Sequence, residues 1–169
     1  KISEPIGNND YKPSVARWNM ATGEINPMPY EYPDLKKVRF IYTASAEHQL
    51  YVQCYTQYDL MTICDFNGNL KCNIYGPKWV NEKTQTQHYS LGVEFCGDKI
   101  LALYSGGDHR TDAYYPTKFL VFDLNGNYLK TLETGYMITD FCYDKENNRL
   151  IINLNDEIQF AYLDLEGII

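Results

Sequence analysis

The sequence predicts an all-β domain built from repeated units of four antiparallel strands. Short apolar runs alternate with turn residues along the whole chain, which is typical of strands joined by tight turns. A strand–turn–strand motif recurs four times. No long segment has the 3.6-residue period of an amphipathic helix. We therefore expect no ordered helix longer than about two turns.

The repeated motif has the chemistry of a hairpin. Each copy consists of an apolar strand, an Asp or Asn, a short turn closed by Gly, and a second apolar strand. The Asp or Asn side chain accepts hydrogen bonds from the turn backbone, and Gly supplies the positive φ that closes the turn. The glycines are Gly23, Gly68, Gly126 and Gly167, spaced by 45, 58 and 41 residues.

These spacings leave room for four strands in each complete unit, which is the pattern of β-propeller blades. We expect a single partial propeller domain over residues 1–169, with units at 14–30 (partial), 38–75, 90–133 and 138–169 (partial). A closed propeller has about four to eight blades. The chain is therefore expected to be part of a longer protein, or to complete its sheet with another copy of itself.

The composition supports a folded domain and excludes some partners. Of the 169 residues, 44% are hydrophobic and 15% aromatic, including 16 tyrosines, which rules out a disordered chain. The formal net charge of −7 argues against a nucleic-acid or anionic-membrane partner. No apolar run is long enough for a transmembrane helix. The five cysteines include no C-x-x-C pair, so buried thiols are expected rather than a metal site.

The hairpin motif resembles that of the six-bladed TolB-like and NHL-like propellers, whose blades carry a strand ending in Asp-x-x-Gly. Asp65/Gly68, Asp123/Gly126 and Asp164/Gly167 match this pattern, and Asn19/Gly23 has one extra residue. The resemblance implies a six-bladed propeller of an exported protein, periplasmic or at the cell surface.

Two connections are longer than a hairpin requires, at Gly76–His88 and Ser105–Thr117. In an up-and-down blade these connections emerge at the same end of the sheet, and long loops on a rigid scaffold are common binding sites. We therefore predict a non-catalytic module that binds a peptide, glycan or protein there. The candidate ligand-binding residues are Trp79, Asp108, His109, Arg110, Asp112, Tyr114 and Tyr115.

Two alternative functions stay open at this point. Glu94 and Asp140 lie in predicted innermost strands and are candidate lining residues of the propeller channel. By analogy with calcium-dependent lactonase-like propellers, they suggest a metal-dependent hydrolase. The other alternative is a structural subunit of a larger assembly. Asp108, His109 and Asp112 are ligand types for a metal, but solvated loop residues are the simpler interpretation. No cofactor and no catalytic residue is predicted, because no nucleophile or phosphate-binding motif occurs.

Overall fold

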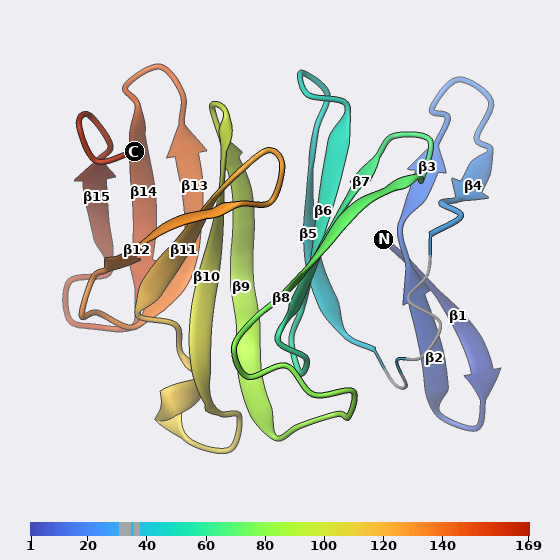
Figure 1. The fold of residues 1–169 in the computed structure, drawn as a ribbon, viewed down its shortest axis with the longest axis horizontal. Coiled ribbons are helices and arrows are strands. Elements are labelled where there is room, and N and C mark those ends of the chain that lie inside the picture. The colour runs from blue at the N-terminus through green and yellow to red at the C-terminus, as the bar shows by residue number, and fades with distance from the viewer. Residues whose placement is uncertain (31–34, 36–37) are drawn as a thin grey trace.

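The computed structural model describes residues 1–30, 35 and 38–169, and this part of the chain is almost entirely β (Figure 1). Its one helical segment is the 3₁₀ turn η1 (Asp112–Tyr114). The described residues contain no helix long and apolar enough to cross a membrane. The first strands form two small hairpins, β1 (Ile2–Gly7) with β2 (Asp10–Ser14) and β3 (Ala16–Trp18) with β4 (Ile25–Pro27).

Three larger antiparallel sheets follow, and in each of them consecutive strands pair. The second-unit sheet contains β5 (Phe40–Ser45), β6 (Leu50–Tyr55), β7 (Leu60–Asp65) and β8 (Leu70–Tyr75). The third-unit sheet contains β9 (Thr86–Cys96), β10 (Lys99–Asp108), β11 (Lys118–Asp123) and β12 (Tyr128–Glu133). The fourth-unit sheet contains β13 (Ile138–Asp144), β14 (Arg149–Leu154) and β15 (Phe160–Asp164).

These sheets stand side by side in chain order, like adjacent blades (Figure 1). The first strand of each sheet contacts the next first strand, β5 with β9 and β9 with β13. The prediction of four-stranded antiparallel units is therefore confirmed for the second and third units. The fourth unit has three strands, as its sequence predicted.

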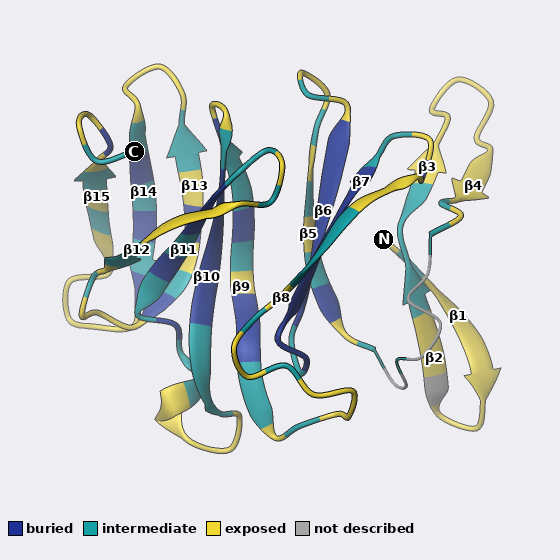
Figure 2. Ribbon diagram, viewed as in Figure 1, coloured by how far each residue is buried: buried dark blue, intermediate teal, exposed yellow. Residues whose placement is uncertain are grey.

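The central strands are buried on both faces. Along β10, Ile100 and Ala102 pack into a cluster shared with the second-unit sheet, while Leu101 and Leu103 pack into a cluster shared with the fourth-unit sheet. Alternate side chains of a strand point to opposite faces, so a sheet between two neighbours needs a continuous apolar run. Figure 2 shows the buried middle strands and the more exposed outer strands β8 and β12.

The Asp–Gly turns are equivalent in the second and third units. Asp65 accepts hydrogen bonds from the backbone N–H groups of Asn67 (2.8 Å) and Asn69 (2.9 Å). Asp123 accepts from the N–H groups of Asn125 and Asn127 at the same two distances. Both aspartates, and Asp164 in the last sheet, stand at the end of the third strand of their sheet. The repeat assignment is thereby confirmed.

Two features differ from the sequence expectation. The hairpin β1–β2 was not predicted, because its residues are mostly exposed and show no apolar alternation. In addition, β9 begins at Thr86 instead of Ser90, and β10 runs on to Asp108. These extensions pair with each other through register shifts. The residues Thr86, Gln87 and Ser105–Asp108 are polar or glycine, so apolar patterning gives no signal for them, although His88 and Tyr89 in the same extension of β9 are buried.

Candidate functional site

The two long loops contact each other at one end of the sheets. The Lys78 ammonium donates a hydrogen bond to the Gly106 carbonyl at 3.3 Å. The backbone N–H of His109 donates to the Gln85 carbonyl at 3.1 Å, and its ring Nδ1 is 2.9 Å from the same oxygen. Figure 1 shows both loops at the end opposite the Asp–Gly turns. The expected contact between Gly76–His88 and Ser105–Thr117 is therefore present, and we call this surface the loop face.

The Ser105–Thr117 loop is held by its own hydrogen bonds. The Asp108 carboxylate accepts from the Arg110 backbone N–H (2.9 Å) and from its guanidinium Nη2 (2.8 Å). These bonds from Arg110 keep the pKa of Asp108 well below its usual range. The Ser105 hydroxyl donates to the Ala113 carbonyl at 2.6 Å and accepts from the Gly107 N–H at 3.0 Å. Asp108 and Ser105 therefore act within the structure to shape the loop.

The aromatic candidates are packed more closely than the sequence suggests. Trp79 is half-buried, 4.9 Å from the Tyr75 ring and 6.3 Å from the Tyr58 ring between centroids. It packs against the buried cluster at the base of the second-unit sheet. The rings of Tyr114 and Tyr115 lie 4.2 Å apart and are also half-buried. Trp79 therefore anchors its loop, and the exposed candidates are His109, Arg110 and Asp112.

The metal alternative for Asp108, His109 and Asp112 gains no support. Within residues 1–30, 35 and 38–169, no three His, Cys, Asp or Glu side chains converge as a metal site would require. The Asp108 carboxylate lies 3.7 Å from His109 Nδ1. Its hydrogen bonds go to Arg110 instead.

Glu94 and Asp140 line one shallow hollow across the first strands, as their predicted positions require. The hollow has a volume of about 380 Å³ and is bordered by β5, β9 and β13. Burial, and next the nearby Asp140 carboxylate, raise the pKa of Glu94. The structure therefore brings together two carboxylates from neighbouring blades.

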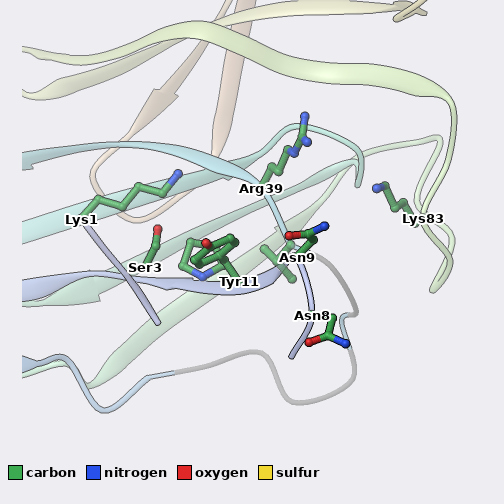
Figure 3. Close-up of a pocket in the computed structure, with 9 residues that line it drawn as sticks. Lys1, Ser3, Asn8, Asn9, Tyr11, Arg39 and Lys83 are labelled. Atoms are coloured by element: carbon green, nitrogen blue, oxygen red, sulfur yellow. The ribbon is translucent and has the colours of Figure 1, made fainter. Parts of the chain in front are cut away.

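A polar pocket of about 420 Å³ extends the loop face toward the N-terminal hairpin (Figure 3). Its cationic lining residues are Lys1, Arg39 and Lys83, and none of its lining residues in the described part of the chain is a carboxylate. Burial, and next the Arg39 charge, lower the pKa of Lys1. Sequence analysis missed this pocket because its residues come from the β1–β2 hairpin, the start of the second unit and the loop at Gly76–His88. Of the cationic residues, only Lys83 lies in a segment that the sequence predicted to be a binding loop, Gly76–His88.

A second pocket missed by sequence analysis lies between the second-unit and third-unit sheets. It has a volume of about 420 Å³ and is lined by Asp59, Gly76 and several aromatic rings. Asp59 and the neighbouring His88 are each 1% exposed. The available signal was a charged residue within the apolar run Tyr58–Ile63, since carboxylates are rarely buried without a partner.

Comparisons with known proteins agree on the fold. No family model matches the sequence, and no curated protein matches it. A solved member of the DUF4221 family from Bacteroides vulgatus is similar, with a TM-score of 0.60 and 13% identity over 88% of this chain and 54% of that chain. A chain of a nidogen/laminin complex has a TM-score of 0.57 and 13% identity over 90% of this chain and 52% of that chain.

The WD40 domain of Neurospora crassa Pan2 gives a TM-score of 0.45 with 14% identity, covering 75% of this chain and 32% of that chain. The chain thus spans about half the length of the first two structures and about a third of the last. With its repeated four-stranded sheets, the protein has a β-propeller fold. The neighbours do not single out the TolB-like or NHL-like families.

Proposed function

We propose that this chain is a non-catalytic binding module whose ligand surface is the loop face. One observation carries the proposal: two loops longer than the fold requires are joined by hydrogen bonds from Lys78 and His109. Ordered loops on a rigid sheet scaffold are a common setting for binding residues. The exposed side chains of His109, Arg110 and Asp112 are then presented without a large cost in loop ordering.

The packing of the aromatic residues favours a peptide or protein ligand over a glycan. Trp79 uses its ring against Tyr75 and Tyr58, so it is not a free stacking platform. The cations of the adjoining pocket, Arg39 and Lys83, favour an acidic segment in the partner. The similar chain of the nidogen/laminin structure was crystallised in a protein–protein complex, which is consistent with this kind of partner.

The finer parts of the proposal rest on resemblance. A six-bladed ring and an exported location, periplasmic or at the cell surface, follow from the likeness to TolB-like propellers alone. The alternative of a metal-dependent hydrolase has one supporting observation, the shared hollow of Glu94 and Asp140. Enzymes of that kind collect several ligands at one point, so we rank this alternative second.

The proposal predicts that exposed residues of the loop face control affinity. The chain is screened against a peptide array that includes acidic sequences, and affinities for the best peptides are measured by calorimetry. We expect Arg110→Ala to weaken binding about tenfold or more, as loss of an interfacial charged hydrogen bond does. Lys145→Ala is the matched control, because Lys145 is 72% exposed and ion-paired with Glu47, much as Arg110 is 67% exposed and paired with Asp108.

Lys145 lies in the β13–β14 turn, at the opposite end of the sheets (Figure 1). Its replacement should leave the affinity unchanged. Equal losses in both variants, or no loss in Arg110→Ala, would place the binding surface elsewhere.

A further inference from the structure

The pocket between the second-unit and third-unit sheets combines aromatic walls with a buried carboxylate. Its lining rings belong to Tyr75, Tyr89, Tyr104, Phe122 and Tyr128, and Asp59 lines it as well. Tyr89 and Tyr104 pack edge to face, with centroids 5.2 Å apart. The pocket holds about 420 Å³, which is within the range of small-ligand sites.

Among the described residues, no lysine or arginine forms an ion pair with the Asp59 carboxylate. Its Oδ2 accepts a hydrogen bond from the Lys78 backbone N–H at 2.9 Å. Its Oδ1 is buried without a hydrogen-bond partner among the described residues, and the nearest ring nitrogen, His88 Nδ1, is 3.7 Å away. Burying a carboxylate is costly unless it is paired and hydrogen-bonded.

His88 does not supply the missing charge. Burial has the largest effect on His88 and lowers its pKa. The nearby Asp59 charge raises this pKa, and the Lys78 charge lowers it again. The imidazole is therefore neutral near pH 7. Its Nδ1 lies 3.2 Å from the Tyr104 hydroxyl, and its Nε2 is buried without a partner among the described residues. The cluster thus has one acceptor, Asp59 Oδ1, without a hydrogen-bond partner among the described residues, and the cation that lines the pocket, Lys118, pairs with Glu133.

The packing of the blades does not require this cluster, as the next interface shows. Between the second and third units, the Thr84 N–H and hydroxyl both donate to the Gln57 carbonyl, at 3.3 and 3.1 Å. Between the third and fourth units, the Thr134 N–H and hydroxyl donate in the same way to the Thr117 carbonyl, at 2.9 and 2.7 Å. The two interfaces therefore share one backbone arrangement.

His88 and Asp59 are present in addition to the backbone hydrogen bonds that the two interfaces share. The His88 N–H donates to the Thr56 carbonyl, and Ile138 makes the corresponding bond to Pro116, so an apolar residue takes the place of His88 in the next interface. Strand β11 begins directly after Thr117, whereas two residues, one of them Asp59, separate Gln57 from strand β7. The second unit therefore has a buried carboxylate that has no counterpart in the next interface.

We propose that this inter-sheet pocket binds an alkylammonium group, with Asp59 as its counter-charge and the tyrosine rings as its walls. An ammonium ion gains both a charge-assisted hydrogen bond to the carboxylate and cation–π contacts with the rings. Lys118 already places its ammonium 5.9 Å from the centre of the Tyr104 ring, and this ammonium pairs with Glu133 at 3.5 Å. A ligand cation would compete with Lys118 for the same rings.

The first test uses 2-phenylethylammonium as the probe, with 2-phenylethanol as its neutral analogue. Calorimetry and proton NMR of the tyrosine signals should detect the ammonium with a Kd of about 1 mM or lower, and the alcohol at least about tenfold more weakly. Asp59→Asn should weaken ammonium binding about tenfold, because it removes the counter-charge at nearly constant volume. Asp98→Asn, which removes an exposed carboxylate in the β9–β10 turn that does not line the pocket, should have no effect.

A second variant keeps the test decisive if Asp59→Asn fails to fold. Lys118→Met removes the competing cation and should tighten ammonium binding severalfold. Failure of the wild-type protein to bind the ammonium would overturn the proposal, as would equal affinity for the alcohol or weaker binding by Lys118→Met.

Lysine peptides and their acetylated forms then identify the source of the ammonium group. Binding of the unmodified peptide alone assigns the site to a lysine side chain, and preference for the small amine assigns it to a metabolite.

Discussion

Replacing Gly126 with Ala is expected to lower the free energy of unfolding by about 2–5 kcal/mol, combining left-handed backbone strain with overpacking. Gly126 closes the third-unit turn at a φ of +86°, and a Cβ there would lie 2.8 Å from both Cys72 Sγ and Ile74 Cδ1. These two atoms belong to β8 of the preceding sheet. The turn is therefore also a contact between blades, and urea denaturation followed by circular dichroism measures the loss.

Gly167→Ala separates the two causes. Gly167 closes the fourth-unit turn at a similar φ of +70°, but a Cβ there would meet no atom of the described residues within 4 Å. Its replacement should cost only the strain of the backbone, about 1–2 kcal/mol. If the two variants lose the same stability, the contact between the Gly126 turn and the preceding blade contributes nothing, and the packing of these sheets as blades is wrong.

Replacing Gly107 with Ala is expected to disrupt the observed conformation of the Ser105–Thr117 loop and the binding that depends on it. A Cβ at Gly107 would lie 1.9 Å from the Ala113 carbonyl oxygen. This is the same oxygen that accepts the Ser105 hydroxyl, so the loop cannot close around the added methyl group. The clash should cost about 1–3 kcal/mol locally, with little loss in the rest of the sheet, because Gly107 lies near the end of β10, beyond the residues that pair with β11.

Gly7→Ala is the control for Gly107→Ala. Neither glycine has a positive φ, and a Cβ at Gly7 would meet nothing within 4 Å. Amide hydrogen exchange should be faster at Tyr114 and Tyr115 in Gly107→Ala and unchanged in Gly7→Ala, with peptide affinity lost only in the former. Retained exchange protection in Gly107→Ala would show that the loop conformation does not depend on the close contact between Gly107 and the Ala113 carbonyl.

The fold was predictable where the sequence signal is local. The Asp–Gly turns at Gly68 and Gly126 depend on residues within one turn, and the apolar run of β10 reflects burial on both faces. The β1–β2 hairpin was not predictable, because Pro5 and Pro13 interrupt it and its side chains contact solvent. Its pairing rests on backbone hydrogen bonds that leave no apolar pattern.

The candidate site was predictable only in position. Loop length and blade topology placed His109 beside the other loop, where the structure has it. The packing of Trp79 and the burial of Asp59 against His88 depend on contacts between segments far apart in the sequence. The burial of Asp59 against His88 also requires knowledge of how one blade docks against the next, which residue patterns within a blade do not contain.

The central claim, that the loop face binds the ligand, is tested most directly by hydrogen–deuterium exchange with the tightest peptide from the screen. The account predicts increased protection at Gly76–His88 and Ser105–Thr117 when the peptide is added, with no change in the turns at Asn67–Asn69 and Asn125–Asn127. Protection confined to those opposite turns, or to the strands around Glu94 and Asp140, would contradict it.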